Sequence, residues 1–544
     1  MLGLMQSQPL MISGILVHAA RHHADAEVVS RQGDGTLVRH SYAVLEHRAR
    51  QLARALGRLG VQNSDRVATL AWNGHRHMEL YYGVSGMGAI VHTVNPRLAA
   101  DDIVGILNDA GSTLLFTDPA FAPLVAAVAP QVPGLRAVIV MGTPAEMPEL
   151  ELGSAQKLLC YEDLLTDDDY EWPSFDERTA SALCYTSGTT GKPKGVLYSH
   201  RSTLLHAYAV NLADVFGLRS VDRIMPVVPM FHVNAWGIPY AAPMVGASLI
   251  MPGRQLDGPS VAALMNSERV TMSAGVPTVW MGLVTYLRES GTRLETLRRL
   301  ICGGSACPAM LIDAFRDEYG VQVDHAWGMS ETSPLGTCYA PKASFAALSA
   351  EEGARMQYKQ GRAVPGLDMK IVDDAGASLP WDGVTFGNLM VRGLWVTQRY
   401  MNADADSVDA QGWFPTGDVA TIDRHGMMEI TDRTKDIVKS GGEWISSIQL
   451  ENIAVAFPTV VEAAIVAARH PKWDERPLLI VVAKPGTTID AAALLASFDG
   501  KVAKWWVPDQ VVVVDKLPHT ATGKINKLAL RQRFRDFELA SLAT

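Results

Sequence analysis

The run Tyr185–Gly195 combines the residue types that bind phosphate groups, since it reads Tyr-Thr-Ser-Gly-Thr-Thr-Gly-Lys-Pro-Lys-Gly. Glycines allow backbone N–H groups to close on an anion, hydroxyl groups donate to phosphate oxygens, and Lys192 and Lys194 add positive charge. The run follows the apolar residues Ala180–Cys184, and Ser199 is a suitable N-cap for a helix after it. We therefore predict a polyphosphate-binding loop between two secondary-structure elements.

The glycine spacing excludes the Walker A loop of P-loop NTPases. The pattern G-x-x-x-x-G-K-[ST] cannot be laid over Gly188, Gly191 or Gly195. A solvated turn rich in Gly, Ser and Thr is the simpler alternative, and it is the usual interpretation of a bare glycine-rich loop. The ordered mixture of hydroxyls, glycines and lysines favours phosphate binding.

Single charged side chains stand in three later segments. Glu331, in Trp327–Thr332, is an oxygen ligand of the kind that magnesium prefers. Asp418, in Trp413–Asp418, has two oxygens that match the two hydroxyls of a ribose. Lys524 follows a glycine near the C-terminus. The simpler alternatives are a surface carboxylate, an aspartate that caps its own turn, and an exposed lysine.

These segments together resemble the adenylate-forming superfamily, which includes acyl-CoA synthetases, firefly luciferase and the adenylation domains of peptide synthetases. They follow in the family's order and spacing, so the resemblance covers nearly the whole chain. Gly303–Pro308, otherwise a plain strand-to-helix turn, resembles the family's adenine-side loop, and Ser330 stands where threonine is usual. The resemblance implies that ATP and AMP are bound by Thr186, Ser187, Gly188, Thr189, Thr190, Gly191, Lys192, Lys194, Gly303, Gly304, Ser305, Ala306, His325, Ala326, Trp327, Gly328, Ser330, Asp418, Arg433 and Lys524.

The resemblance also implies a role for several side chains. Lys524 bridges the carboxylate of the acid and the α-phosphate of ATP, where two anions meet, and stabilises the charge of the transition state. Glu331 and Thr189 hold Mg2+ on the phosphates. Asp418 accepts hydrogen bonds from the ribose hydroxyls, and Arg433 approaches the ribose. The implied catalytic residues are Lys524, His232, Glu331 and Arg433.

Two further segments imply the acyl and coenzyme A sites. Pro229–Gly237 resembles the acyl entrance of fatty acyl-CoA synthetases, unless it is a buried aromatic cluster with a satisfied histidine. Lys439–Trp444 contains glycines that let the pantetheine arm pass close to the backbone, unless it is only a hairpin turn. The implied acyl pocket is formed by His232, Val233, Trp236, Gly303, Gly328 and Pro334. The implied coenzyme A site is formed by Lys439, Ser440, Gly441, Gly442, Glu443 and Trp444.

The implied activity is that of an AMP-forming acyl-CoA ligase that uses ATP, Mg2+ and coenzyme A. Met1–Gly3, Val227–Gly237 and Trp473–Pro477 look most like the bacterial medium-chain fatty acyl-CoA ligases and the 3-methylmercaptopropionyl-CoA ligases. A short- or medium-chain fatty acid is the expected substrate, and 3-methylmercaptopropionate is the alternative, because discrimination per methylene is weak.

Other activities compete with this one. A carrier-protein-loading adenylation domain, a luciferase-like oxidase of the acyl-adenylate and an inactive acyl-nucleotide-binding protein share the family's motifs. The first would load the acyl group onto a carrier protein and is separated by omission of coenzyme A, and the second would show as oxygen uptake or light. Joint retention of Thr189, Glu331, Asp418, Arg433 and Lys524 argues against the third.

Composition narrows the class of protein. A chain of 544 residues is longer than a protein with a single hydrophobic core, so several packed units are expected. A composition of 48% hydrophobic and 19% charged residues predicts an ordered globular protein. The formal net charge of -9 disfavours nucleic acid as a partner. Five cysteines without a C-x-x-C pair and the lack of a long apolar run favour a cytoplasmic protein without a transmembrane segment. The family resemblance implies a homodimer.

The elements that must position these residues follow an α/β pattern. Val44–Leu59 has apolar residues at helical spacing, which predicts an amphipathic surface helix. Short apolar runs alternate with helical stretches up to Met141, and the same rhythm returns from Arg223 to Val323, which predicts parallel sheets. Pro9–Val17 is expected to form the first helix and not a secretory signal.

We predict an α/β fold with a large N-terminal domain at residues 1–431, which consists of two α/β subdomains and a β-rich subdomain. Short strands and Gly/Asp turns in Gly361–Thr431 indicate the β-rich part. A charged hinge at residues 432–436 and a small mobile C-terminal α+β domain at residues 437–544 complete the prediction. The resemblance implies that this domain swings between an adenylating and a thioester-forming pose.

Overall fold

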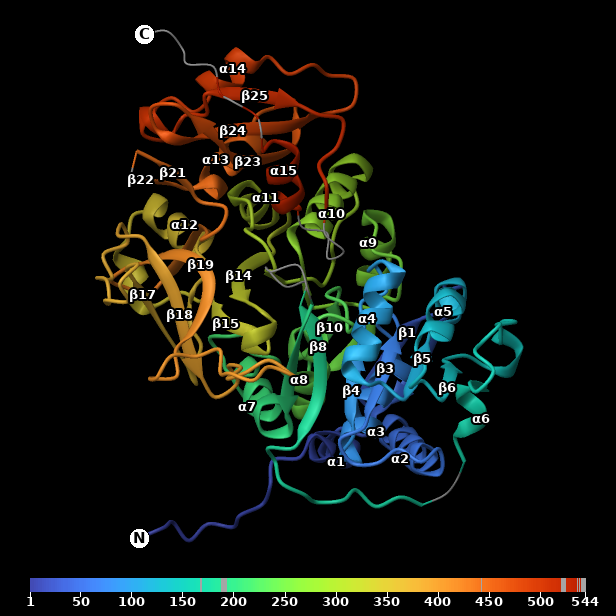
Figure 1. The fold of residues 1–544 in the computed structure, drawn as a ribbon. Helices are drawn as coiled ribbons and strands as arrows, with labels where there is room; N and C mark the ends of the chain where they lie inside the picture. The colour runs from blue at the N-terminus through green and yellow to red at the C-terminus, as the bar shows by residue number, and fades with distance from the viewer. Residues whose placement is uncertain are drawn as a thin grey trace.

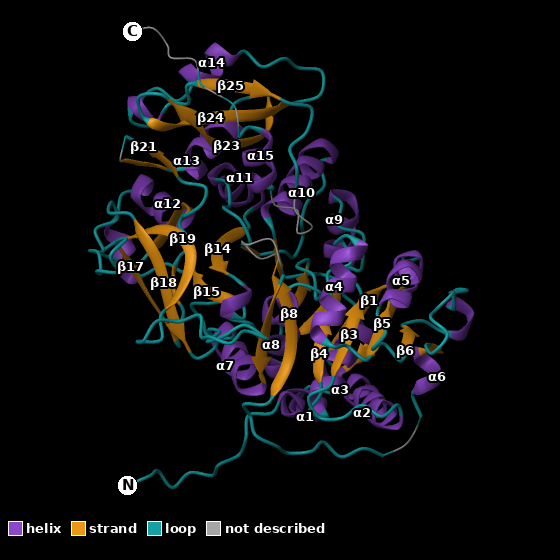
Figure 2. Cartoon of the chain, in the orientation of Figure 1, coloured by secondary structure: helices purple, strands orange, loops and turns teal. Residues whose placement is uncertain are grey.

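Mostly parallel sheets form the larger part of this computed structural model, which describes residues 1–166, 169–186, 193–441, 443–519, 525–535, 537 and 539, with Glu443 by its backbone only (Figures 1 and 2). One sheet has the strand order β7-β6-β5-β3-β4-β8-β9, and its neighbours are parallel except for the antiparallel pair β8 and β9. Its strands are β3 (Arg66–Leu70), β4 (Ile90–Thr93), β5 (Leu114–Thr117), β6 (Ala137–Val140), β7 (Lys157–Cys160), β8 (Ala180–Thr186) and β9 (Lys194–Ser199).

A second sheet has the order β16-β15-β14-β13-β12-β10-β11-β1-β2. Its strands are β1 (Glu27–Arg31), β2 (Leu37–Ser41), β10 (Arg223–Pro226), β11 (Ser248–Met251), β12 (Met272–Gly275), β13 (Arg299–Cys302), β14 (Gln322–Gly328), β15 (Leu335–Cys338) and β16 (Arg362–Ala363). The predicted parallel sheets are therefore confirmed. The N-terminal β1 lies parallel to β11, so the first strand of the chain joins a sheet built from much later residues.

A shared apolar core joins the two sheets. A single buried cluster contains residues of both sheets and of the helices between them, such as Leu16, Leu52 and Tyr81. These helices are α1 (Ile12–His22), α2 (Tyr42–Arg58), α3 (His75–Gly86), α7 (His200–Val210) and α8 (Ile238–Val245). The other faces are covered by α4 (Ala100–Ala110), α5 (Ala122–Val128), α6 (Tyr161–Leu164), α9 (Gly258–Ser267), α10 (Pro277–Ser290), α11 (Ala309–Tyr319) and α12 (Ala350–Tyr358).

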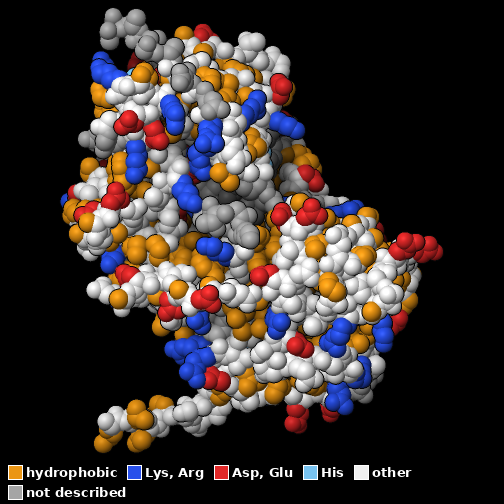
Figure 3. Space-filling view, viewed as in Figure 1, with side chains coloured by type: hydrophobic (Ala, Val, Ile, Leu, Met, Phe, Trp, Pro, Cys, Tyr) orange, Lys and Arg blue, Asp and Glu red, His pale blue; other side chains and the backbone are white. Residues whose placement is uncertain are grey.

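The N-terminal helix begins later than predicted. Helix α1 starts at Ile12, and the backbone N–H groups of Leu10 and Ile12 are fixed by Glu177 Oε2 (2.9 Å) and His200 Nδ1 (3.1 Å). The residues before Leu10 extend away from the body, and Met1 and Leu2 are fully exposed (Figure 3).

Helix α2 is more buried than a surface helix. Its bounds agree with the predicted helix, and its leucines are fully buried as expected. However, Gln51 and Ala55 are buried as well, and Arg48 does not face solvent. The Arg48 guanidinium donates to Glu79, which has no solvent exposure, and to Glu162. The prediction of an amphipathic surface helix is confirmed for Arg54 and Arg58, which are exposed, but not for Arg48, because α3 and α6 cover that part of the polar side.

An antiparallel sheet and a C-terminal sheet complete the fold. The predicted β-rich part is confirmed as the order β17-β18-β19-β20, with β17 (Leu367–Val372), β18 (Gly387–Gly393), β19 (Phe414–Ile422) and β20 (Met428–Arg433). The C-terminal sheet pairs β21 (Val438–Ser440), β22 (Glu443–Ile445), β23 (Val460–His470), β24 (Asp474–Ala483) and β25 (Gln510–Val513), with α13 (Ser447–Val455), α14 (Ala491–Ala496) and α15 (Lys527–Arg533). Apolar clusters made of residues from Val438 onward lie between these elements.

Part of the predicted hinge belongs to a strand. Strand β20 continues to Arg433, and Asp432 is only 1% exposed. The Ser447 backbone N–H donates to Asp432 Oδ2 (2.6 Å). A solvated charged linker therefore does not describe Asp432, although the domain limits at 431 and 437 stay a prediction.

No helix in the described part of the chain is long and apolar enough to cross a membrane.

The buried histidines make the stability of the fold depend on pH. Burial lowers the pKa of His75, His92 and His206 to about 3 and that of His77 and His200 to about 4. An unfolded imidazole has a pKa of about 6.5, so below that pH the unfolded chain binds more protons than the folded one. The free energy of unfolding therefore falls as pH decreases from about 6.5 towards about 4.

We expect the urea midpoint of unfolding to decrease from about pH 7 to about pH 5.5. His92→Gln removes one of these groups and keeps a polar partner for Ser112, which lies 2.8 Å from His92 Nδ1. This variant should lose less stability over that pH range than the wild type, whereas the exposed His22→Gln should lose as much. An equal loss in all three proteins would contradict the prediction.

Candidate active site

The predicted site residues gather where parallel strands end. Strands β10, β12, β13 and β14 are neighbours in register, so their carboxyl ends lie on one edge of the sheet. The segments Pro229–Gly237 and Gly303–Pro308 follow β10 and β13, and Trp327–Thr332 begins with the last two residues of β14. Ligands of open α/β sheets bind at such an edge. The predicted phosphate loop follows β8 and is flanked by the strand pair Thr186 and Lys194.

The adenine-side loop is fixed by a neutral histidine. The Cys307 backbone N–H donates to His325 Nε2 (3.3 Å), and His325 Nδ1–H donates to the Tyr358 carbonyl (3.0 Å). Burial lowers the pKa of His325, consistent with one accepting and one donating nitrogen. The His325 ring therefore connects the loop at Cys307 to Tyr358, and contact of His325 with ATP stays a prediction.

The two predicted ribose residues, Asp418 and Arg433, contact each other through the Asp418 carboxylate. Asp418 is 3% exposed, and its oxygens accept hydrogen bonds from Trp327 Nε1 (2.9 Å) and Arg433 Nε (2.7 Å). Asp418 and Arg433 face each other across β19 and β20, and the Trp327 ring lies over Gly336, where a Cβ has no room. An aspartate that caps its own turn is excluded, because these bonds reach other segments. Each oxygen retains a lone pair for a hydroxyl of the ligand.

Glu331 is held by an aromatic residue that the sequence did not single out. Glu331 is 6% exposed, so the surface-carboxylate alternative is wrong. Tyr400 Oη donates to Glu331 Oε1 (2.6 Å), and Lys194 Nζ lies 4.8 Å from the centre of the Tyr400 ring. Burial, and then the Glu331 charge, raise the pKa of Tyr400, so the phenol stays a donor. Nothing in the sequence around Tyr400 signals this contact.

The carboxylate of Glu331 fits a magnesium ion that arrives with phosphates. Magnesium is usually held by one or two carboxylates, water and substrate phosphates, and not by a complete protein cage. In the described residues, the group of side chains close enough to cage a metal is His40, His75 and Glu79, on other elements. Glu331 would hold the ion with one oxygen and the ATP phosphates would supply other ligands, and this role of Glu331 stays a prediction.

The acyl segment contains a left-handed turn. Val233, Asn234, Ala235, Trp236 and Gly237 all have φ between 45° and 75°. Such a conformation costs about 1–2 kcal/mol for each L-residue with a side chain, so the surroundings must hold it. Tyr81 Oη donates to the carbonyl of Met230 and lies 3.3 Å from Asn234 Oδ1.

This turn brings the acyl segment against the nucleotide loop. Trp236 is 9% exposed, and its ring lies about 3.1 Å from the position of a Cβ on Gly303. His206 packs on Gly237 and accepts a hydrogen bond from the Leu335 backbone N–H (3.2 Å), next to Pro334. His206 thus links the turn to the strand that follows Gly328 and Pro334. The sequence analysis missed His206, which lies inside an ordinary helical stretch.

Family models match most of the chain. The model described as AMP-binding enzyme matches residues 16–401, and the AMP-binding enzyme C-terminal domain matches residues 449–524. The chain belongs to the AMP-binding enzyme family.

Relatives of this AMP-binding enzyme align over almost their whole length. A 3-methylmercaptopropionyl-CoA ligase of Ruegeria lacuscaerulensis is 51% identical over 98% of this chain and 99% of that protein. A medium-chain-fatty-acid–CoA ligase of Ectopseudomonas oleovorans is 49% identical over 99% of each chain. The structure of the anthranilate CoA ligase AuaEII with anthranoyl-AMP has a TM-score of 0.85 at 24% identity, covering 98% of this chain and 99% of that one. The predicted family and fold class are confirmed.

The predicted coenzyme A segment of the AMP-binding enzyme is a hairpin. Lys439 pairs with Trp444 across β21 and β22, and its Nζ lies 5.4 Å from the indole ring. Gly441 has φ 58° and lies against the Trp473 ring. A role for this hairpin in coenzyme A binding stays a prediction.

Several predicted residues lie outside the described part of the chain. They are Ser187, Gly188, Thr189, Thr190, Gly191, Lys192, Gly442 and Lys524, and the side chain of Glu443.

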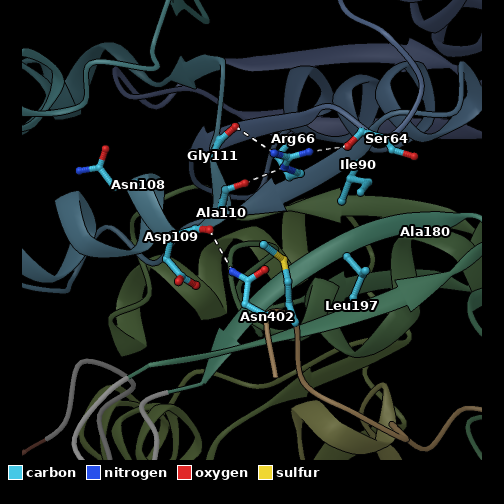
Figure 4. A pocket seen from close by; sticks show the side chains of 11 residues that line it. Ser64, Arg66, Ile90, Asn108, Asp109, Ala110, Gly111, Ala180, Leu197 and Asn402 are labelled. Carbon is cyan, nitrogen blue, oxygen red and sulfur yellow. Dashed lines mark hydrogen bonds between the residues drawn. The ribbon is translucent and has the colours of Figure 1, made fainter. Parts of the chain in front are cut away.

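A surface hollow is lined by residues other than the predicted site residues. It has a volume of about 390 Å³ and lies between the C-terminal end of α4 and β9 (Figure 4). The Arg66 guanidinium is occupied by the carbonyls of Ser64, Ala110 and Gly111, and Asn402 donates to the Asp109 carbonyl. Because these polar groups already have partners, the hollow offers little to a ligand.

Because Ala235 lies in the left-handed turn, replacing it by glycine should change the free energy of unfolding less than a usual Ala→Gly substitution. Ala235→Gly removes a buried methyl group but also removes the cost of the left-handed conformation, so we expect a change of unfolding free energy within about 0.5 kcal/mol. The matched variant Ala241→Gly, in the buried interior of α8, should lose about 2 kcal/mol. Urea unfolding measures both, and equal losses would contradict the left-handed turn.

Proposed function

We propose that this protein is an AMP-forming acyl-CoA ligase for short- and medium-chain carboxylic acids. The observation that carries the proposal is the contact of Trp236, in the acyl segment, with Gly303 in the adenine-side loop. An enzyme that joins an acid to AMP must bring its acyl site and its nucleotide site together. The near-complete alignment with acyl-CoA ligases at about half identity supports the same activity.

The first step forms an acyl-adenylate. A carboxylate oxygen of the acid attacks the α-phosphorus of ATP, the bond to the β-phosphate oxygen breaks, and pyrophosphate leaves. Asp418 and Arg433 orient the ribose, and Glu331 faces the phosphates. His232 lies beside the left-handed turn, near the acid, and Lys524 offsets the repulsion between the two anions.

The second step transfers the acyl group to coenzyme A. The thiol sulfur attacks the acyl carbon, the bond from that carbon to the AMP oxygen breaks, and the thiol loses its proton. AMP leaves with both electrons of that bond. We assign the pantetheine arm to Lys439–Trp444.

The acid itself is a choice between two close candidates. A medium-chain fatty acid and 3-methylmercaptopropionate share a carboxylate and an apolar tail, and relatives named for each align equally well. We favour a range of short- and medium-chain fatty acids, with the thioether acid as the alternative. A homodimer in the cytoplasm remains part of the proposal, and light scattering of the purified protein tests the dimer.

The activity is tested by exchange of labelled pyrophosphate into ATP, with acids from propionate to palmitate and 3-methylmercaptopropionate. We expect exchange with short- and medium-chain acids and AMP release only when coenzyme A is present. Lys524→Ala is the control and should abolish exchange while ATP still binds. No exchange with any acid would support an inactive nucleotide-binding protein instead, and AMP release without coenzyme A would support another acceptor.

The variant Tyr400→Phe tests whether the Tyr400 hydroxyl positions the Glu331 carboxylate. Loss of a hydrogen bond to a charged group costs about 1.5–3 kcal/mol, so the exchange rate at limiting Mg2+ should fall about tenfold or more. Raising the Mg2+ concentration should restore part of the rate, because the phenol positions the carboxylate and does not react. The exposed Tyr208→Phe should show no change. A fall that Mg2+ does not relieve would contradict this role.

A further inference from the structure

Two histidines and a glutamate meet between β2 and α3. One nitrogen of His40, one nitrogen of His75 and one carboxylate oxygen of Glu79 all lie within 4.8 Å of one another. His40 Nδ1 lies 3.7 Å from Glu79 Oε1, and the centres of the two imidazole rings are 4.6 Å apart, edge to face. His75 and Glu79 are buried, whereas the His40 side chain is 20% exposed, so the cluster has one side open to solvent.

Regular secondary structure brings these three side chains together. His75 and Glu79 are four residues apart on α3, so they lie on the same face of that helix. His40 lies on β2, which pairs with β1. The backbone N–H of His75 donates to Ser30 Oγ on β1 (2.8 Å), and this bond fixes the start of α3 against the strand pair that carries His40.

Both imidazoles have a nitrogen without a partner. His40 Nδ1 and His75 Nδ1 are buried, and neither makes a hydrogen bond within the part of the chain that the structure describes. Leaving a buried polar atom unpaired costs free energy, so such atoms usually bind a water molecule or an ion. Two of them beside one buried carboxylate indicate a bound species that all three side chains share.

The charges around the cluster limit how tightly a cation can bind. Arg48 Nε donates to Glu79 Oε1 (2.7 Å), and Tyr161 Oη donates to Glu79 Oε2 (2.5 Å). Arg48 and Arg76 also pair with Glu162, so two guanidinium groups face two carboxylates before any ion is added. A carboxylate oxygen accepts more than one bond, so Glu79 Oε1 can hold a metal beside Arg48. Repulsion by Arg48 then weakens the binding.

We propose that His40, His75 and Glu79 form a binding site for a zinc ion, with water as the fourth ligand. Two imidazole nitrogens, a carboxylate oxygen and water are a ligand set that zinc accepts. Zinc–ligand bonds of about 2.0–2.2 Å require the three side chains to approach one another when the ion binds. The simpler alternative is a buried water molecule that bridges the two nitrogens.

The position of the site indicates a structural role for the ion. Strand β2 belongs to the second sheet, whereas α3 connects β3 and β4 of the first. A zinc ion between β2 and α3 would therefore connect the two sheets and stabilise the folded state in proportion to its affinity. The ion takes no part in the proposed reaction.

Zinc binding to the metal-stripped full chain, measured in competition with a chromogenic chelator, tests the site. We expect the wild type to bind one tight equivalent of Zn2+, and His40→Gln and His75→Gln to bind it at least about tenfold more weakly, because loss of even an outer partner has that effect. Zinc should raise the thermal midpoint of unfolding of the wild type but not of His40→Gln.

The matched control is His22→Gln. His22 and His18 form an exposed pair on α1 with ring centres 4.7 Å apart, which is the competing surface site for zinc. The control should bind zinc as the wild type does. Loss of the tight equivalent in His22→Gln, with retention in His40→Gln, would overturn the proposal and assign the ion to this surface pair.

Other outcomes also decide the proposal. Equal zinc affinity of the wild type and His40→Gln, or no tight zinc binding by the wild type, would overturn the site and favour a bridging water. Because His40 is partly exposed, His40→Gln keeps the test valid if His75→Gln unfolds. Pyrophosphate exchange with Mg2+ should persist in the zinc-free wild type, so its failure would overturn the proposed function and not the zinc site.

Discussion

The buried carboxylate of Asp418 is the constraint on which the candidate site depends. A charge that is removed from water must be paired and hydrogen-bonded, and Asp418 satisfies this with Trp327 and Arg433. Trp327 ends a strand of the large sheet, whereas Asp418 and Arg433 lie on the antiparallel sheet. The same bonds that compensate the buried charge therefore fix the antiparallel sheet against β14, which ends at Gly328 just before Ser330 and Glu331.

Neutral histidines fix backbone segments around the acyl segment, as Asp418 fixes the antiparallel sheet. His206 and His325 are buried and uncharged, and each accepts a backbone N–H, at Leu335 and Cys307. An imidazole is suited to this because burial removes its charge at little cost near neutral pH, which is not possible for lysine or arginine. These bonds fix the backbone at Leu335, next to Pro334, and at Cys307, in the adenine-side loop. The strained turn at Val233–Gly237 persists because such contacts over-determine it.

Much of the fold could be predicted because it follows from local patterns. The alternation of short apolar runs with helical stretches gave the strands β3 to β6 within a few residues. It also indicated a second α/β part between Arg223 and Val323, where β10 to β13 lie, and Ser199 caps α7 as expected. The pairing of β1 with β11 could not be predicted, since periodicity says nothing about partners distant in sequence. The position of Arg48 was predicted wrongly for a related reason. A helical pattern does not show that Arg48 pairs with Glu79, a buried residue of another helix.

By itself, the sequence determined the family, the order of the motifs and the residue types of the site, because glycines, hydroxyls, lysines and carboxylates have fixed chemistry. The tertiary structure decided which of them meet. It placed Asp418 with Trp327, gave Glu331 its partner Tyr400, and turned the acyl segment left-handed. Those outcomes depend on packing and desolvation between segments far apart in the chain, which act only after the sheets have assembled.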